Sequence, residues 1–297
     1  MSGTCTGRFA PSPTGPLHIG SLLCAVASFL DARAQGGRWL VRIEDLDPPR
    51  EKPGAAADIL RTLEAHGLHW DGAVAYQSQR LALYHEALGQ LARDGHAFRC
   101  TLSRAQLDAL GSNHPGRRYS EAHDDGGQDF AWRLDVPDED IVFDDRIQGC
   151  CRFNLARDGG PFVIRRRDGL FAYQLAVTVD DAAQGVTDIV RGSDLLDSTP
   201  RQLLLQRRLG LPAPRHAHIP VLVDPQGNKL GKQYGAAPVT PARRMENLRL
   251  VLSALGQRVV SRETDADTPE ALLAVAARNW SIDAVPRRIS IPVAALC

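Results

Sequence analysis

The first 43 residues contain two strand-like runs separated by a turn and one helix-like run, and this order limits the folds open to the chain. Residues 5–10 (CTGRFA) and 39–43 (WLVRI) have the apolar character of short buried strands. The turn PSPTGPLHIG follows the first strand, and SLLCAVASFLDARAQ then shows helical apolar spacing that ends at Gly36-Gly37. A strand, a glycine-containing turn, a helix and a second strand open a doubly wound α/β fold with a parallel sheet.

The remaining chain continues this pattern after one interruption. Helical runs are expected at about 54–66 and 78–94, and residues 100–160 then hold short strand-like runs and a polar loop. The α/β texture returns with a hairpin turn expected at Asp168-Gly169 and a strand that runs into a loop in DIVRGSDLL (188–196). A helix is expected from Ser198-Thr199 to about Leu209, and a strand at 218–223 (HIPVLV). We therefore expect the two halves of a Rossmann-type domain at 1–98 and 161–237, an inserted small α+β domain at 99–160, and a helical segment at 238–297.

Composition excludes several classes of protein. The 35 basic and 35 acidic residues give a net charge of zero, so any nucleic-acid partner is expected to meet a local patch rather than a broadly basic surface. The longest apolar stretch, Leu22 to Leu30, is too short to cross a bilayer, and residues 1–10 lack an export signal. The six cysteines include no CxxC pair. We expect a cytoplasmic protein with free thiols and no membrane partner.

The turn after the first strand is a candidate phosphate site. It lies at the carboxyl end of a parallel strand, where ligands bind in open α/β sheets, and the next helix points its free N–H groups toward it. Three prolines stiffen the turn, and Gly15 and Gly20 allow the backbone to approach a ligand closely. His18 could donate a hydrogen bond to a phosphate oxygen.

Lys229 and Lys232 form a second candidate phosphate site more than two hundred residues downstream. They bracket Leu230-Gly231 in a loop that follows an expected strand. Two lysines beside a triphosphate would neutralise the charge that develops on departing pyrophosphate, and their flexible side chains suit a loop.

Together the two segments resemble a known pair of signatures. "GRFAPSPTGPLHIGSL" and "KLGKQ" resemble the signatures of the glutamyl branch of class I aminoacyl-tRNA synthetases, with Ser21 in place of the second histidine and Gly231 and Gln233 in place of serines. The resemblance implies a Rossmann-type catalytic domain that uses ATP with Mg²⁺. It implies ATP binding by His18, Gly20, Ser21, Lys229 and Lys232, with His18 and Lys232 as the catalytic pair.

A third set of segments indicates the amino acid. An arginine fork matches a carboxylate, a glutamate after the second strand could hold an ammonium group, and a tyrosine hydroxyl could donate a hydrogen bond. "RFAPS", "RIEDLD" and the stretch from Tyr173 to Gln202 resemble glutamyl-type segments. The resemblance implies glutamate binding by Arg8, Phe9, Ala10, Pro11, Ser12, Glu44, Tyr173 and Arg191.

The length of the chain favours one branch of the family. About sixty residues follow the lysine loop, which is too few for the anticodon-reading half of a full glutamyl-tRNA synthetase. The shorter form resembles the glutamyl-Q tRNA(Asp) synthetases, which activate L-glutamate with ATP without tRNA and attach it to the queuosine base of tRNA(Asp). The implied partners are L-glutamate, ATP and tRNA(Asp) carrying queuosine, with no protein partner. One alternative is a glutamyl-tRNA synthetase-like fragment that charges a tRNA 3′ end, and the missing anticodon-binding half argues against it. The other is a non-catalytic paralogue, favoured by the changes at Ser21, Gly231 and Gln233.

The expected small domain carries a degraded zinc pattern. The family often binds zinc with Cys-x-Cys and Tyr-x-x-x-Cys, and here Cys100 and Tyr119 stand at two of these positions. Leu102 and His123 stand at the others, and leucine cannot bind a metal. Cys100, Tyr119 and His123 are therefore weak metal candidates, and we do not expect zinc because closed zinc sites need four good donors.

Overall fold

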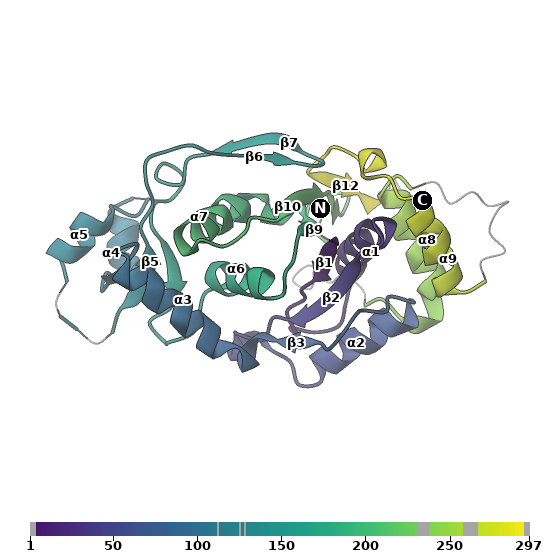
Figure 1. The fold of residues 1–297 in the computed structure, drawn as a ribbon, viewed down its shortest axis with the longest axis horizontal. Helices are drawn as coiled ribbons and strands as arrows, with labels where there is room; N and C mark the ends of the chain where they lie inside the picture. The colour runs from purple at the N-terminus through teal and green to yellow at the C-terminus, as the bar shows by residue number, and fades with distance from the viewer. Residues whose placement is uncertain are drawn as a thin grey trace.

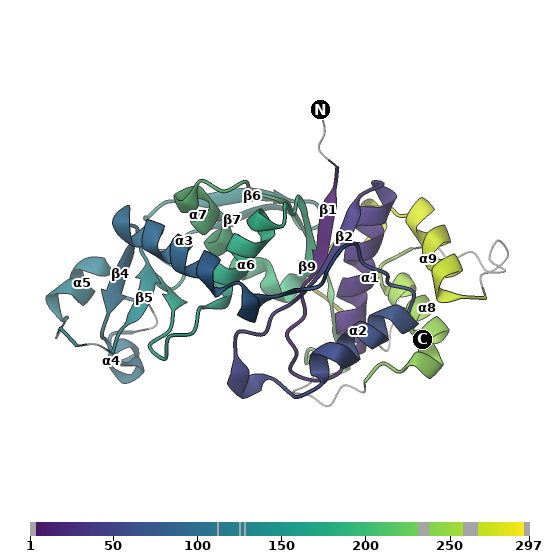
Figure 2. The same cartoon turned by 60° about the horizontal axis from the view of Figure 1, so that its bottom comes forward.

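The protein is an elongated molecule with a parallel sheet at its centre (Figure 1). The structure, a computed structural model, describes residues 4–111, 113–124, 126–127, 129–230, 238–257 and 267–293. A small lobe that contains α4, α5 and β5 lies at one end of the long axis, and α8 and α9 lie at the other (Figures 1 and 2). The turn after β1 and Lys229 of the second candidate segment both belong to the central part.

The α-helices of the described residues are α1 (Ile19–Ala34), α2 (Ala55–Ala65), α3 (Leu81–Arg93), α4 (Arg104–Ala109), α5 (Arg117–Ala122), α6 (Tyr173–Ala183), α7 (Thr199–Leu209), α8 (Arg244–Ala254) and α9 (Pro269–Arg278). The strands are β1 (Thr6–Phe9), β2 (Arg38–Ile43), β3 (Ala75–Tyr76), β4 (Ala97–Cys100), β5 (Ala131–Leu134), β6 (Ile141–Asp145), β7 (Gly149–Phe153), β8 (Phe162–Arg165), β9 (Asp188–Gly192), β10 (Arg215–Ile219), β11 (Val221–Val223) and β12 (Ser290–Pro292). The expected helices at 54–66 and 78–94 are confirmed as α2 and α3.

The central strands run in the doubly wound order. β1 pairs parallel with β2 and β2 with β3, while β9 pairs parallel with β10 and β10 with β6. β9 lies beside β1, where the Thr187 N–H donates to the Thr6 carbonyl at 2.9 Å. The strands therefore follow the order β3, β2, β1, β9, β10 and β6. The topological switch point, where strands begin to be added on the other side of β1, lies between β1 and β9. The expected fold class is confirmed.

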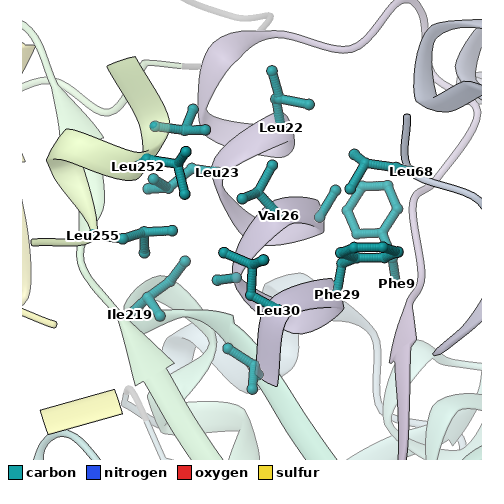
Figure 3. Packing of buried hydrophobic residues seen from close by; sticks show 14 of the residues in the cluster. Phe9, Leu22, Leu23, Val26, Phe29, Leu30, Leu68, Ile219, Leu252 and Leu255 are labelled. Atoms are coloured by element: carbon teal, nitrogen blue, oxygen red, sulfur yellow. The ribbon is translucent and has the colours of Figure 1, made fainter. Parts of the chain in front are cut away.

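Helix α1 is the centre of the larger hydrophobic core. Its apolar residues recur on more than one face, so α1 packs against β1 and β9 and also against α8 and α9. Leu22, Leu23, Val26 and Leu30 are almost completely buried, and Figure 3 shows them between Leu252 and Leu255 on one side and Phe29 and Phe9 on the other. The helix ends before Gly36, whose positive φ of 64° suits a residue without a side chain. The expected helix over this stretch is confirmed.

Two expected elements are wrong in detail. The run HIPVLV is not one strand, because Pro220 has no N–H to continue a ladder, and it separates β10 from β11, which lie in different sheets. The turn at Asp168-Gly169 is present, but it closes only a single bridge between Arg165 and Phe171, and the chain then enters α6. A short apolar run such as LFAYQLAV fits a buried helix as well as a strand.

The strand pairing cuts across the expected insert boundaries. β4, β5 and β8 form one antiparallel sheet, which extends to Arg165, beyond the expected boundary at residue 160. The hairpin of β6 and β7 lies inside the expected insert, yet β6 pairs with β10 of the central sheet. The expected insert therefore contributes strands to two different sheets, its own antiparallel sheet and the central one. The division of the chain into four segments stays a prediction.

A buried histidine in β10 predicts how stability depends on pH. His216 is 3% exposed, its Nε2 has no hydrogen-bond partner among the described residues, and burial lowers its pKa to about 3. The folded protein therefore keeps His216 neutral, while the unfolded chain takes up a proton below about pH 6.5. We expect the free energy of unfolding to fall by roughly 1.4 kcal/mol per pH unit below that value on account of this residue.

Urea unfolding at pH 7 and at about pH 5.5 measures this contribution. His216→Gln removes the titrating ring, so the variant is expected to lose less stability on acidification than the wild type, by roughly 1 kcal/mol. Equal pH dependence in the wild type and His216→Gln would contradict the assignment.

Candidate active site

A cavity of about 480 Å³ opens at the carboxyl ends of β1, β9 and β10. This is the edge at which ligands bind in doubly wound sheets. The structure brings together here most of the residues expected to bind glutamate or ATP: Arg8, Phe9, Ala10, Pro11, Ser12, His18, Gly20, Ser21, Tyr173, Arg191 and Lys229. Glu44 lines an adjoining cavity of about 290 Å³, which shares Ser12, Thr14 and Tyr173 with the first. Lys232 lies outside the described residues.

His18 caps the amino end of α1 at the floor of this cavity. Its Nδ1 accepts a hydrogen bond from the Ser21 N–H at 3.3 Å, and its Nε2 lies 3.1 Å from the Ser21 hydroxyl. Because Nδ1 accepts, a neutral ring carries its proton on Nε2, which is the donor that a phosphate oxygen needs. A Cβ on Gly20 would lie 3.2 Å from the His18 ring and 3.4 Å from the Leu230 carbonyl. Gly20 therefore lies between the His18 ring and the lysine segment, with little room for a side chain.

The lysine segment reaches the same cavity from β11. The Leu230 N–H donates to the Leu222 carbonyl at 2.8 Å, and the Val239 N–H donates to the Leu17 carbonyl at 2.9 Å. Lys229 Nζ forms an ion pair with Asp194 at 2.5 Å, with the two side chains 47% and 34% exposed. A partly exposed pair of this kind contributes only about 0–1 kcal/mol, so Lys229 can exchange Asp194 for a phosphate at little cost.

Arg191, near the end of β9, is a buried cation that no carboxylate of the described residues contacts. It is 4% exposed and forms no ion pair with any residue that the structure describes. Its guanidinium donates instead to neutral acceptors: His218 Nε2 at 3.0 Å, Thr199 Oγ1 at 2.8 Å and the Leu195 carbonyl at 3.3 Å. Burial lowers the pKa of Arg191. A buried charge without a counter-ion is costly, so this position favours an anionic ligand.

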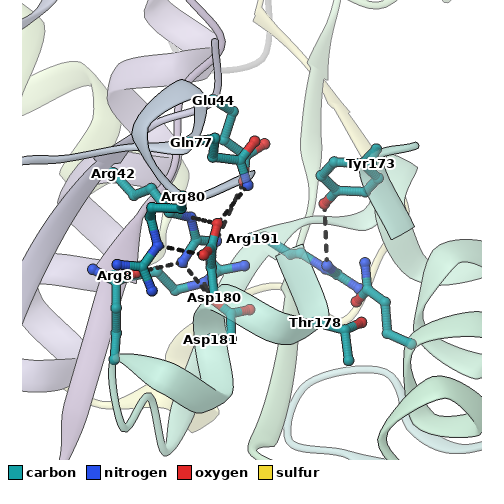
Figure 4. A network of polar contacts seen from close by, with 12 residues as sticks. Arg8, Arg42, Glu44, Gln77, Arg80, Tyr173, Thr178, Asp180, Asp181 and Arg191 are labelled. Carbon is teal, nitrogen blue, oxygen red and sulfur yellow. Dashed lines mark hydrogen bonds and ion pairs between the residues drawn. The ribbon is translucent and has the colours of Figure 1, made fainter. Parts of the chain in front are cut away.

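Arg8 approaches the same cavity from β1 and is held by a carboxylate. Its Nε donates to Asp181 Oδ1 at 3.3 Å, and Arg42 Nη1 donates to the same oxygen at 2.8 Å (Figure 4). Burial alone would raise the pKa of Asp181, but the two arginines together lower it below its usual value. Asp181 therefore stays ionised and fixes Arg8 by Nε, so that the terminal nitrogens of Arg8 remain available to a ligand carboxylate.

Glu44 is the buried anion of the adjoining cavity. Its side chain is 8% exposed, and its contact among the described side chains is with Arg42 Nη2 at 3.3 Å. Burial raises the pKa of Glu44, which means that its ionised form lacks solvation. The Glu44 N–H donates to the Pro11 carbonyl at 3.0 Å, which places the carboxylate beside the turn. An ammonium group bound here would add a second positive charge beside the carboxylate, on the side that Arg42 does not contact.

Behind these groups lies Asp180, which the sequence analysis did not identify. It is completely buried and accepts hydrogen bonds from Gln77 Nε2 at 2.8 Å, Arg80 Nε at 2.5 Å and the Tyr84 hydroxyl at 2.6 Å. Figure 4 shows that it joins the start of α3 to α6 beside Arg42. Asp180 and Asp181 therefore connect the arginines of the site to the core.

Three further residues near the cavity were also missed. Asp194 follows the end of β9 in "RGSDLL", so its position after a parallel strand was a usable signal. Thr199 and His218 touch Arg191 from α7 and β10. Their sequence context is that of an ordinary helix start and an ordinary strand, and it gave no signal.

The weak metal candidates do not converge on one point. The rings of Tyr119 and His123 stack on each other at 3.9 Å, and His123 Nδ1 lies 2.8 Å from the Tyr119 carbonyl. Cys100 Sγ instead contacts Ser120 and, at 3.5 Å, the Nε2 of His114, whose pKa burial lowers to about 4. Across the residues that the structure describes, no group of three or more His, Cys, Asp or Glu side chains could hold a metal ion.

No helix that the structure describes combines the length and the apolar character that crossing a bilayer needs.

Comparison with known proteins gives a consistent result. The profile of "tRNA synthetases class I (E and Q), catalytic domain" matches residues 4–263. Proteins named glutamyl-Q tRNA(Asp) synthetase are similar along almost the whole chain. The one from Pseudomonas aeruginosa is 52% identical over 292 residues, which are 98% of this chain and 99% of the relative. The one from Ectopseudomonas mendocina is 53% identical over 287 residues, which are 97% of each.

A solved structure supports the fold. The crystal structure of a glutamate tRNA ligase from Elizabethkingia meningosepticum in complex with its amino acid has a TM-score of 0.80 with this chain, at 24% identity. The similarity covers 98% of this chain and 67% of the ligase, and at this identity it concerns the fold alone. With its strand order, its cavity at the carboxyl edge of the sheet and a profile match over most of its length, the chain belongs to the class I (E and Q) tRNA synthetase catalytic-domain family.

Proposed function

We propose that this protein activates L-glutamate with ATP, without tRNA, and transfers the glutamyl group to the queuosine base in the anticodon loop of tRNA(Asp). The name shared by relatives that are about half identical over nearly the full length supports this substrate pair. The observation that carries the proposal is the buried Arg191, whose acceptors among the described residues are all neutral and which lines the cavity together with Arg8. An amino-acid carboxylate is the anion that best fits two guanidinium groups at this depth.

In this proposal the binding groups divide by charge. Arg8 and Arg191 receive the carboxylates of glutamate, and Glu44 receives its ammonium group, with Tyr173 closing the side between them. His18, the backbone N–H groups at the start of α1, and Lys229 receive the phosphates of ATP. The predicted contribution of Lys232, which the described residues do not include, is to the same triphosphate. Mg²⁺ enters with ATP and neutralises part of the phosphate charge.

The proposed chemistry has two steps. An α-carboxylate oxygen of glutamate attacks the α-phosphorus of ATP in line, the bond to the bridging oxygen breaks, and pyrophosphate leaves. A hydroxyl of the queuosine cyclopentenediol then attacks the activated carbonyl, and AMP leaves. Neither step needs a covalent bond to the protein, so alignment of the reactants and stabilisation of the developing charge supply the catalysis.

The substrates place the proposed reaction in the cytoplasm, where tRNA and ATP are both present. The proposed partners are L-glutamate, ATP and tRNA(Asp), and no protein partner is required.

Glutamate-dependent exchange of pyrophosphate into ATP tests the first step. We expect exchange with the purified protein in the absence of tRNA, and much slower exchange with aspartate or glutamine. A complete absence of exchange would favour a non-catalytic relative.

Transfer of labelled glutamate to tRNA(Asp) tests the second step. We expect label on tRNA that carries queuosine, also after removal of its 3′-terminal adenosine, and none on tRNA that lacks queuosine. Label that disappears with the 3′ adenosine would instead indicate charging of the tRNA end.

A further inference from the structure

Three neutral groups accept hydrogen bonds from the Nε and Nη2 of the Arg191 guanidinium. Nε donates to His218 Nε2 at 3.0 Å, and Nη2 donates to Thr199 Oγ1 at 2.8 Å and to the Leu195 carbonyl at 3.3 Å. Nη1 remains on the cavity side, 3.5 Å from the Tyr173 hydroxyl (Figure 4). The contacts at Nε and Nη2 therefore decide where Nη1 points.

The same contacts define the protonation of His218. The Nε–H of Arg191 points at His218 Nε2, and the Thr199 hydroxyl, which accepts from Arg191, lies 3.2 Å from the same nitrogen. With two donors directed at it, Nε2 must be unprotonated, so the ring carries its proton on Nδ1. Nδ1 lies 2.6 Å from Asp145 Oδ2, which accepts this proton in a hydrogen bond.

Asp145 is itself fixed by the backbone around it. Its Oδ1 accepts hydrogen bonds from the N–H groups of Ile147 at 3.0 Å, Gln148 at 2.9 Å and His218 at 3.1 Å. Both Asp145 and His218 have completely buried side chains, and they come from β6 and β10, 73 positions apart in the sequence. This carboxylate therefore has one orientation, with Oδ2 facing the imidazole.

We propose that Asp145 and His218 are positioning residues for carboxylate recognition: Asp145 selects the Nδ1-protonated tautomer of His218, and His218 in turn fixes the Nε of Arg191 so that Nη1 faces the substrate. Neither residue lines the cavity, so both act through Arg191. This positioning role belongs to the amino-acid subsite and rests on the proposed function.

Asp145→Asn tests this series of hydrogen bonds, because it replaces one carboxylate oxygen by an NH₂ group and changes little else. The three backbone N–H groups at the Oδ1 position require the amide oxygen there, so the amide NH₂ group must face His218. That NH₂ group would donate to Nδ1, the ring proton would move to Nε2, and two donors would then face each other between His218 and Arg191. We expect the KM for glutamate in the exchange reaction to rise roughly 10- to 100-fold, with kcat and the KM for ATP changed less than about threefold.

Two comparisons separate positioning from general damage to the fold. Asp144→Asn makes the same change at the preceding, exposed residue of β6 and should leave all three constants unchanged. His218→Gln keeps an acceptor for Arg191 but has no ring tautomer, so adding Asp145→Asn to it should raise KM much less than in the wild type. Full additivity of the two changes would overturn the proposal, as would a normal KM in Asp145→Asn.

Nuclear magnetic resonance of the imidazole nitrogens provides a readout that does not depend on activity. Two-bond ¹H–¹⁵N correlations distinguish the two tautomers, and the His218 signals are those lost in His218→Gln. We expect protonated Nδ1 in the wild type and protonated Nε2 in Asp145→Asn. The Nε2-protonated tautomer or an imidazolium in the wild type would overturn the proposal. A wild type with the expected tautomer but without glutamate-dependent exchange would instead contradict the proposed function and leave this hydrogen-bonded chain in place.

Discussion

Replacing Arg191 by lysine is expected to lower kcat/KM for glutamate in the exchange reaction roughly a thousandfold, or about 4 kcal/mol, although the charge is conserved. Lysine has no Nε donor for His218 and no planar fork that reaches Thr199 and the cavity at once. Its ammonium group would remain buried in a site shaped for a guanidinium. Initial rates over a range of glutamate concentrations, at saturating ATP, measure the effect.

Arg207→Lys is the matched control for this substitution. Arg207 forms a surface ion pair with Glu139, and the two side chains are 55% and 48% exposed. The same change there should leave kcat/KM unaltered. If Arg191→Lys retained more than about a tenth of the wild-type kcat/KM, a loss of less than about 1.4 kcal/mol, Arg191 would not be a main anchor of the substrate.

The second large effect concerns folding rather than binding. Asp180→Ala is expected to lower the free energy of unfolding by about 3–5 kcal/mol, because it leaves buried cationic and polar donors without their acceptor. Asp180 is completely buried, and the donors it would abandon include Arg80 and Tyr84. Denaturant unfolding followed by far-ultraviolet circular dichroism measures the loss.

Glu139→Ala is the control, because it removes a carboxylate whose ion pair with Arg207 is partly exposed. A partly exposed ion pair contributes about 0–1 kcal/mol, so this variant should unfold close to the wild type. A similar loss in both variants would mean that Asp180 stabilises the fold no more than an exposed carboxylate does. Asp180→Asn, which keeps one acceptor oxygen and the volume, should fall between the two.

The first turn of the fold could be predicted because its signals are local. Proline and glycine mark the loop, helical spacing marks α1, and Gly36 marks its end, so each element is encoded within a few residues of itself. The edge of the sheet that carries His18 follows from the rule for parallel strands. For the same reason the cavity contains almost all of the expected residues that the structure describes.

The groups behind the cavity could not be predicted, because their roles arise only in three dimensions. Asp181 meets Arg8 across 173 positions and Asp145 meets His218 across 73. In the sequence Asp181 is one of two acidic residues in a helix, and His218 is a polar residue in a strand, and neither pattern indicates a partner. The expected hairpin at 168–169 was wrong beyond its turn for a related reason, since burial of α6 depends on helices far away in the chain.

Strand β12 has a consequence for anyone who shortens this chain. It lies parallel to β11, the Val221 N–H donates to the Ile289 carbonyl at 3.0 Å, and the Arg288 carbonyl accepts from Gln148 at 3.2 Å. β11 leads directly to Lys229. A deletion that begins before residue 288 would therefore remove β12, the strand that pairs with β11, and β11 precedes the lysine segment. Truncation series and carboxyl-terminal fusions should accordingly be judged by nucleotide affinity as well as by yield.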